Sequence, residues 1–235
     1  MFHKVKIAFP LKQLAAASIL LAAIAAQAFS LDALSNQDAS TGMKAALDKG
    51  AVAAVAQLGV ENGFLGNDKV KIPLPSILEK ARPILKMTGK GQQLDDLVVA
   101  MNHAAEAAVP MAKPLLLNAV KSMSLTDAKN ILSGGDTSVT DFFKQKTAPA
   151  LYQKFLPAVK GATDKVALSA QYNSVVSQVQ KFGAVPAQEA SVEAYVTQKA
   201  LDGLFLIIGE QEQAIRKDPL GAGSSAIAKV FGLMK

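Results

Sequence analysis

Apolar residues recur every three or four positions along almost the whole chain, and this spacing constrains the fold more than any other feature. One stripe comprises Met43, Leu47, Ala51, Ala54 and Leu58. The longest stripe comprises Leu94, Leu97, Val98, Met101, Ala105, Ala108, Ala112, Leu116, Ala119 and Met123. Such spacing places apolar side chains on one face of an α-helix, which must pack against other helices. The chain is therefore predicted to form an all-α, single-domain multi-helix bundle.

The segment from Val192 to Arg216 is the most apolar of the predicted helices. Its stretch "ALDGLFLIIG" is hydrophobic on almost every face, as expected for a central helix surrounded by others. Asp202 interrupts this stretch, and because an unpaired buried carboxylate is costly, we expect a cation or hydrogen-bond donors beside it. Glu212 and Arg216 have the spacing of an ordinary i,i+4 ion pair.

Local signals indicate three further segments. Residues Ser138 to Asp141 resemble a capping box and predict a helix start, and another helix is expected to begin near Ala148. Residues 62–75 depart from the helical pattern, because two turn signals are followed by Val70, Ile72 and Leu74 in alternation with Lys69, Lys71 and Pro73. This alternation predicts a short extended arm or hairpin on the helical body.

The first 28 residues have the pattern of a secretory signal peptide. Lys4, Lys6 and Lys12 precede an apolar stretch from Leu14 to Ala26, and Ala26-Gln27-Ala28 fits a cleavage site. The apolar stretch is shorter than the roughly 20 residues that span a bilayer. We therefore expect cleavage near Ala28, export to the periplasm, and a mature chain over residues 29–235 without a transmembrane anchor.

Cysteine content and charge exclude several kinds of chemistry and partner. The sequence contains no cysteine, so disulfides and thiolate chemistry are both excluded. Removal of the three signal lysines lowers the formal net charge from +6 to +3. The other lysines are scattered, and Arg82 and Arg216 are the only arginines. This distribution is unlike a nucleic-acid-binding surface.

His103 is the only histidine after the signal peptide, which removes most familiar catalytic arrangements. A zinc site needs three or four suitable ligands, and a Ser-His-Asp triad needs a base with the right neighbours. Glycine-rich phosphate loops are also absent. The acidic pairs Asp95 with Asp96 and Asp136 with Asp141 lie beside predicted helix starts, where capping acids are common. We therefore predict a non-enzymatic protein without a metal or cofactor.

The stretch "MNHAAEAAVPMAKP" places Asn102, His103 and Glu106 beside the apolar stripe of a helix that also contains Pro110 and Pro114. Each proline removes a backbone donor, so we expect a bend. Two interpretations are open. The polar side chains can form a buried network with the freed carbonyls, or the bend can open a cleft lined by Asn102 and Glu106.

Five stretches, in order along the chain, carry a resemblance to a known family: "GFLGNDKVKIPLP", "MNHAAEAAVP", "TDAKNILSGGDTSVTDFF", "KALDGLFLIIGEQEQAIRKDP" and a terminal "VFG". Together they resemble the bacterial family DUF4197 over almost the whole mature chain. The resemblance implies an exported, mostly helical envelope protein, and it implies no activity. It also implies arginine where this chain has His103 and Lys144, so an anionic site based on those arginines would be weakened here.

Polar residues within these stretches are candidates for a ligand-binding site or for a polar network that defines the fold: Asn102, His103, Glu106, Asp127, Asp141, Asp202, Glu210 and Arg216. Our first functional hypothesis is a non-enzymatic binding module for an apolar or amphipathic ligand, such as a lipid, in a cleft near Pro110. The alternative is a cell-envelope interaction or structural module that docks a protein partner through the arm from Lys69 to Pro75.

Overall fold

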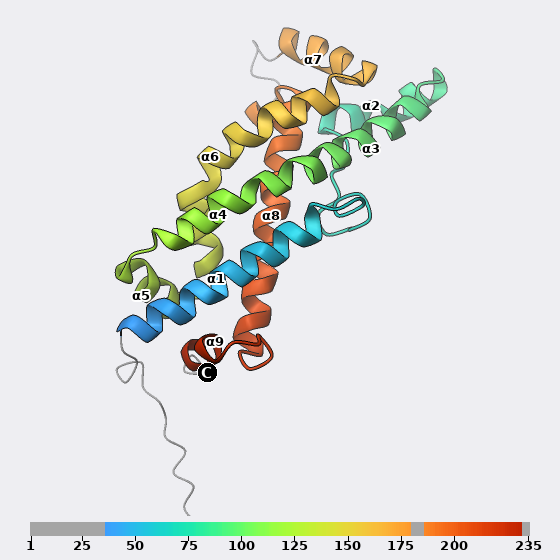
Figure 1. The fold of residues 1–235 in the computed structure, drawn as a ribbon. Coiled ribbons are helices and arrows are strands. Elements are labelled where there is room, and N and C mark those ends of the chain that lie inside the picture. The colour runs from blue at the N-terminus through green and yellow to red at the C-terminus, as the bar shows by residue number, and fades with distance from the viewer. Residues whose placement is uncertain (1–35, 180–185, 232–235) are drawn as a thin grey trace, which may run out of the picture.

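The computed structural model describes residues 36–179 and 186–231, which form a bundle of helices (Figure 1). The α-helices are α1 (Asn36–Leu58), α2 (Ser76–Met87), α3 (Gly91–Ala108), α4 (Ala112–Lys121), α5 (Leu125–Ser133), α6 (Ser138–Thr163), α7 (Ala167–Val179), α8 (Val192–Lys217) and α9 (Ser225–Phe231). Two short 3-10 helices are η2 (Val109–Met111) and η4 (Ala187–Glu189). No strand forms within these two ranges, and the all-α prediction is confirmed. The predicted signal peptide and its cleavage site lie outside the described residues.

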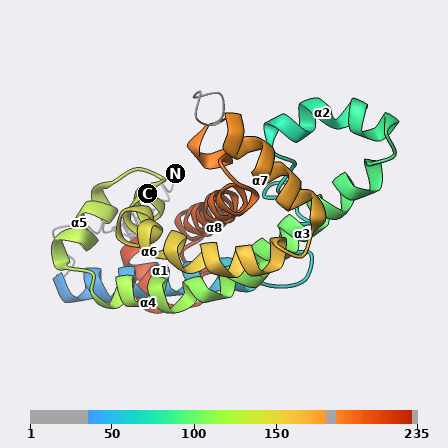
Figure 2. The same ribbon diagram turned by 90° about the horizontal axis from the view of Figure 1, so that it is seen from above.

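Helix α8 lies in the middle of the bundle. It packs against α6, α1 and α3, and Figure 2 shows it nearly end-on among the other helices. Val196, Leu204 and Ile208 on this helix are at most 1% exposed. Asp202 is exposed, and Leu206 one turn later is 46% exposed. Asp202 is therefore not buried, because this strip of α8 is exposed, and the hydrogen-bond donor that we expected beside it is Gln198.

The long apolar stripe between residues 94 and 123 is divided into two helices. Helix α3 ends at Ala108, the 3-10 turn η2 follows, and α4 begins at Ala112. Pro110 lies in this turn, where the missing backbone donor interrupts the α-helical hydrogen-bond pattern. The ring of Pro110 packs closely on the chain directly after α1, since a Cβ atom added to Gly59 would lie 2.8 Å from its Cγ.

Helix α6 is continuous from Ser138 to Thr163, so the helix start predicted near Ala148 is wrong. The helix contains Pro149 and Pro157, and both rings lie on its exposed side. Its other side is held by burial of a row of large apolar residues, which includes Phe143, Leu151, Phe155 and Val159. The packing of this row against the core maintains the helix despite the two donors that the prolines remove.

The arm over residues 62–75 consists of turns followed by an extended segment from Lys71 to Pro75. The hairpin alternative is not formed. The predicted alternation is present, because Val70, Ile72 and Leu74 are buried while Lys69 and Lys71 are exposed. The arm crosses α3 and α8, where its polar backbone groups find side-chain partners.

Helix α2 and the beginning of α3 project from the bundle as a pair (Figures 1 and 2). Leu78 is the one residue of α2 that is buried, and the helix packs mainly against α3. In the described part of the chain, no helix combines the length and apolar character needed to span a membrane.

Candidate functional site

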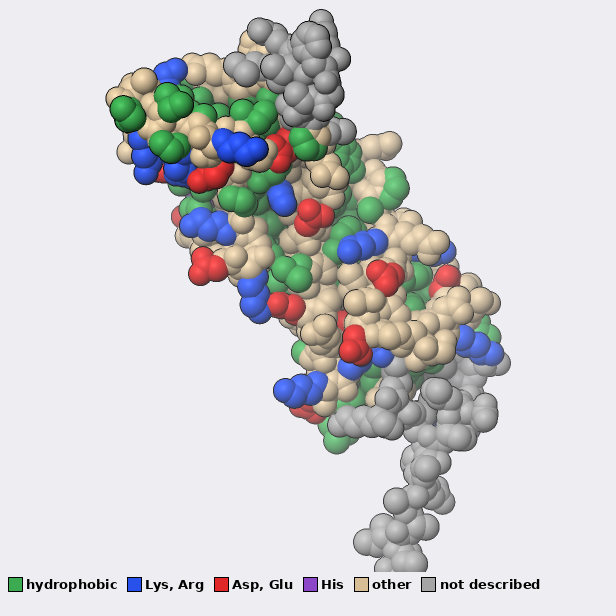
Figure 3. All heavy atoms as spheres, turned by 180° about the vertical axis from the view of Figure 1, so that it is seen from behind, with side chains coloured by type: hydrophobic (Ala, Val, Ile, Leu, Met, Phe, Trp, Pro, Cys, Tyr) green, Lys and Arg blue, Asp and Glu red, His purple; other side chains and the backbone are tan. Residues whose placement is uncertain are grey.

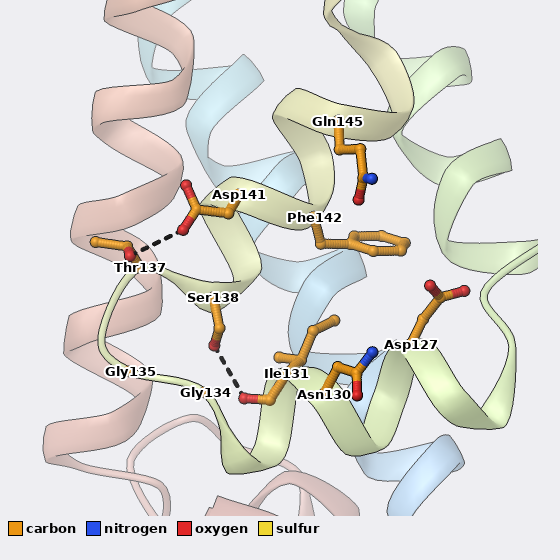
Figure 4. A pocket seen from close by; sticks show the side chains of 10 residues that line it. All are labelled: Asp127, Asn130, Ile131, Gly134, Gly135, Thr137, Ser138, Asp141, Phe142 and Gln145. Carbon is orange, nitrogen blue, oxygen red and sulfur yellow. Dashed lines mark hydrogen bonds between the residues drawn. The ribbon is translucent and has the colours of Figure 1, made fainter.

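A pocket of about 320 Å³ lies between α5 and α6 (Figure 4). Its walls come from one short stretch of sequence: Asp127, Asn130, Ile131, Gly134, Gly135, Thr137, Ser138, Asp141, Phe142 and Gln145. Residues 134–137 connect the two helices, so the pocket forms where the chain turns back on itself. Its volume is at the lower end of the range found for small-molecule sites.

Asp127 is fixed at one edge of the pocket by the start of α5. Its Oδ2 accepts hydrogen bonds from the Ser124 hydroxyl at 2.7 Å and the Ser124 amide at 3.0 Å, and its own amide donates to Ser124 Oγ at 3.0 Å. This reciprocal arrangement is a capping box. The hydroxyl and then the amide of Ser124 lower the pKa of Asp127, so its carboxylate is ionised at neutral pH. Lys146 Nζ lies 3.6 Å from the other oxygen.

Asn130 and Gln145 present side-chain amides to the pocket. Neither amide has a hydrogen-bond partner among the described residues, and both side chains are exposed. Figure 4 shows them on opposite sides of the Phe142 ring, with Asp127 facing the same ring. Phe142 is 6% exposed, so its ring forms part of the pocket wall and of the core. The pocket thus combines an apolar surface with unpaired donors and acceptors.

Asp141 lies at the other edge of the pocket, at the start of α6. The N-cap of this helix is Thr137, whose hydroxyl donates to Asp141 Oδ2 at 3.0 Å and accepts no bond from a helix amide. The Ser138 hydroxyl donates to the Ile131 carbonyl at 2.9 Å. The capping box predicted for Ser138 is therefore wrong, and its side chain joins α6 to the end of α5.

The amides at the start of α6 are capped from α8. The Glu212 carboxylate accepts hydrogen bonds from the amides of Val139 at 3.1 Å and Thr140 at 3.2 Å. Arg216 donates to Glu212 Oε1 through Nε at 3.1 Å and Nη2 at 2.8 Å, and Nη2 also donates to Ser138 Oγ at 2.7 Å. A carboxylate at a helix N-terminus is favoured by the helix dipole. This pair therefore fixes the helix start that forms one wall of the pocket.

Glu212 is a residue that sequence reasoning did not place among the candidates. The pair that it forms with Arg216 is buried, with Glu212 3% exposed, whereas i,i+4 spacing is typical of surface pairs. A signal was present in the sequence. Glu212 lies in the helical row of Ile208 and Ile215, four residues after one and three before the other, and both are buried.

Asn102 lies at the contact between α3 and the arm. Its Oδ1 accepts a hydrogen bond from the Ile72 amide at 2.8 Å. Its Nδ2 donates to the Ile72 carbonyl at 2.9 Å and to the Val98 carbonyl at 2.8 Å. Asn102 is fully buried, and these contacts use both ends of its side-chain amide. Asn102 therefore belongs to a buried polar network, but its partners are the backbone groups of Ile72 and Val98 and not the carbonyls freed by the prolines.

Glu106 binds the arm one turn farther along α3. Its Oε1 accepts hydrogen bonds from the amides of Phe64 and Leu65, both at 3.0 Å, and its Oε2 lies 2.7 Å from His103 Nδ1. Burial alone raises the pKa of Glu106, but the hydrogen bonds from His103, Leu65 and Phe64 outweigh it, so the pKa lies below its ordinary value. Glu106 is 5% exposed and is not among the residues that line the α5–α6 pocket.

The remaining candidates on α8 have separate surroundings. Glu210 Oε1 lies 2.7 Å from Lys69 Nζ and forms an exposed ion pair between α8 and the arm. Asp202 Oδ1 accepts a hydrogen bond from Gln198 Nε2 at 2.9 Å on the exposed strip. The eight candidates thus divide into a group along the arm, a group beside the α5–α6 pocket, and Asp202, which lies apart.

Within the described part of the chain, the ionisable side chains do not form a metal centre. Over residues 36–179 and 186–231, no group of three or more histidine, aspartate or glutamate side chains could hold a metal ion. The α5–α6 pocket can offer its ligand hydrogen bonds, the charge of its carboxylates and an apolar wall.

Comparison with known families gives a match over most of the chain. A family model described as "Protein of unknown function (DUF4197)" matches residues 33–232. Comparisons with curated proteins and with solved structures give no match. The matched range includes every helix from α1 to α9 and therefore the pocket and the arm. The chain belongs to the DUF4197 family.

Proposed function

We propose that the protein is a non-enzymatic binding module of the periplasm and that the pocket between α5 and α6 holds a small amphipathic molecule. The observation that carries this proposal is the pair of side-chain amides, Asn130 and Gln145, which lie beside the Phe142 ring without partners in the described part of the chain. Ligand sites typically combine an apolar wall with a few convergent polar groups.

The charges of the pocket favour a particular kind of ligand. Asp127 and Asp141 are carboxylates that accept hydrogen bonds when ionised, and the amides of Asn130 and Gln145 can both donate and accept. Lys146 offsets only part of this negative charge, since it lies beside Asp127. The ligand should therefore present hydroxyl or ammonium groups to the carboxylates and an apolar edge to Phe142.

We place the ligand here and not near Pro110. Asn102 and Glu106, which would have lined that cleft, are buried and already bonded to the arm. The alternative function, docking of a protein through the arm, has less support. Both backbone groups of Ile72 pair with Asn102, so this part of the arm offers no free edge for strand addition.

Native mass spectrometry of the mature protein, purified under mild conditions, tests the proposal. A panel of amphipathic amines, amino sugars and polyols is then titrated by calorimetry. We expect Asn130→Ala and Gln145→Ala to weaken binding of any ligand found by at least fivefold, because each removes hydrogen bonds between the pocket and the ligand. Gln153→Ala is the matched control, since Gln153 is an exposed glutamine of the same helix outside the pocket. Absence of any bound compound, or equal binding by all variants, would refute the assignment.

A further inference from the structure

The projecting end of the α2–α3 pair exposes large apolar side chains. This end, residues 80–90, is called the α2–α3 tip. Ile84 is 66% exposed and Met87 is 87% exposed, the highest value among the exposed large apolar residues of the described chain. Lys80, Ile84 and Met87 have the i, i+4, i+7 spacing of one helix face. In a pair of helices surrounded by water, large apolar residues ordinarily face the other helix of the pair.

The tip also carries lysines without structural partners. Lys80, Lys86 and Lys90 make no side-chain hydrogen bond or ion pair with any described residue. The pKa of the Glu79 carboxyl is lowered mainly by the hydrogen bond from Arg82, and Lys86 contributes less. The nearby acids have other partners. Arg82 holds Glu79 at 2.9 Å and lies 3.7 Å from Asp95, and Asp96 accepts a hydrogen bond from Gln92 at 2.8 Å.

Figure 3 shows the surface of the molecule at this tip. Hydrophobic and basic side chains, with some acidic ones among them, gather at the end of the molecule formed by α2 and the beginning of α3. The lysine stems can lie along apolar surface while their ammonium groups reach outward. Exposed aliphatic residues bordered by lysines are typical of helices that lie in the interface of a membrane with anionic lipids.

A membrane surface fits this tip better than a folded protein does. A stable protein interface buries about 800 Å² on each partner, and two apolar side chains at a helix end cover only a small part of that area. Shallow insertion into lipid headgroups needs fewer apolar side chains. Each lysine near an anionic bilayer adds about fivefold to the affinity.

We propose that the α2–α3 tip is a peripheral docking site for an anionic lipid surface, with Ile84 and Met87 inserted among the headgroups and Lys80, Lys86 and Lys90 paired with lipid charges. This site is distinct from the α5–α6 pocket and does not depend on its ligand. Binding through the tip would keep an exported protein at the membrane while its pocket stays accessible.

Sedimentation of the mature chain with vesicles tests the proposal. We expect binding to vesicles that contain phosphatidylglycerol, much weaker binding to pure phosphatidylcholine, and release at high salt. The triple variant Lys80→Gln, Lys86→Gln, Lys90→Gln should lose at least tenfold in affinity. Its control is the triple variant Lys113→Gln, Lys129→Gln, Lys154→Gln, which makes the same change in net charge at exposed lysines elsewhere.

The apolar contact can be tested by fluorescence, because the sequence contains no tryptophan. Met87→Trp places one fluorophore at the tip, and its emission should shift to the blue with anionic vesicles. Leu220→Trp is the control, since Leu220 is 82% exposed but lies outside the tip. The proposal is overturned if the protein does not sediment with anionic vesicles, if both lysine variants weaken binding equally, or if Met87→Trp and Leu220→Trp respond alike.

Discussion

Asn102 pairs with Ile72 as a neighbouring β-strand would. Its side-chain oxygen accepts the Ile72 amide at 2.8 Å, and its side-chain nitrogen donates to the Ile72 carbonyl at 2.9 Å. An extended segment inside an all-α protein has no strand beside it, so a buried backbone amide and carbonyl need a partner of another kind. One asparagine on α3 satisfies both groups of Ile72.

The first prediction follows from this pairing. Asn102→Ala should lower the free energy of unfolding by about 1 to 3 kcal/mol, because it leaves the buried polar groups of Ile72 without partners. Urea unfolding followed by circular dichroism measures the change. Gln93→Ala on the same helix is a suitable control, since Gln93 is exposed. Unchanged or increased stability for Asn102→Ala would favour an open cleft at this position.

Glu106 gives a prediction about pH. Its pKa is lowered in the folded protein from an ordinary value of 4.5, so its ionised form stabilises the fold. This contribution is fully present above the unfolded pKa and is lost as the pH falls through the folded pKa. Glu106→Gln should therefore be less stable than the parent at pH 7, and the difference should shrink below about pH 4.5. Unfolding in urea at a series of pH values measures it, and a constant difference would contradict the prediction.

Helical periodicity predicted the bundle because each apolar stripe marks the side of a helix that packs against other helices. It placed α8 at the centre, and the alternation in the arm correctly predicted that Val70, Ile72 and Leu74 are buried. It could not predict what the arm's backbone binds, since Asn102 is 30 residues from Ile72 in sequence. The hairpin alternative was wrong because the backbone of Ile72 pairs with a side chain of α3 and not with a second strand. A partner on a distant helix leaves no local pattern.

The candidate site was predictable only in part. Asp127 and Asp141 were named from the sequence, and both line the pocket between α5 and α6. The pocket itself lies where α5 meets α6, and the Ser138 hydroxyl joins the two helices there by donating to the Ile131 carbonyl and accepting from Arg216. Sequence spacing gives the neighbours of a residue on its own helix and does not give the helix that packs over it.

Glu212 and Arg216 provide the third prediction. Glu212→Ala should destabilise the fold by about 3 to 5 kcal/mol, because it leaves a largely buried guanidinium and two helix amides without their carboxylate. Asp164→Ala is the matched comparison. It removes a carboxylate that also pairs at 2.8 Å over an i,i+4 spacing, with Lys160, but both side chains are at least half exposed. Its effect on denaturant unfolding should be too small to measure. Similar effects from both changes would show that burial does not determine the strength of the Glu212 contact.

Two glycines give the last prediction, because alanine should act in opposite directions at them. A Cβ atom at Gly203 of α8 would lie 2.7 Å from Cε1 of Phe64, a fully buried arm residue that cannot move freely. Gly203→Ala should therefore cost about 1 to 3 kcal/mol through overpacking. Gly161 of α6 has no atom within 4 Å of an added Cβ, so Gly161→Ala should stabilise the helix by about 0.5 kcal/mol. Urea unfolding of the two variants measures both signs. A neutral effect of Gly203→Ala would show that the Phe64 ring is not packed closely on α8.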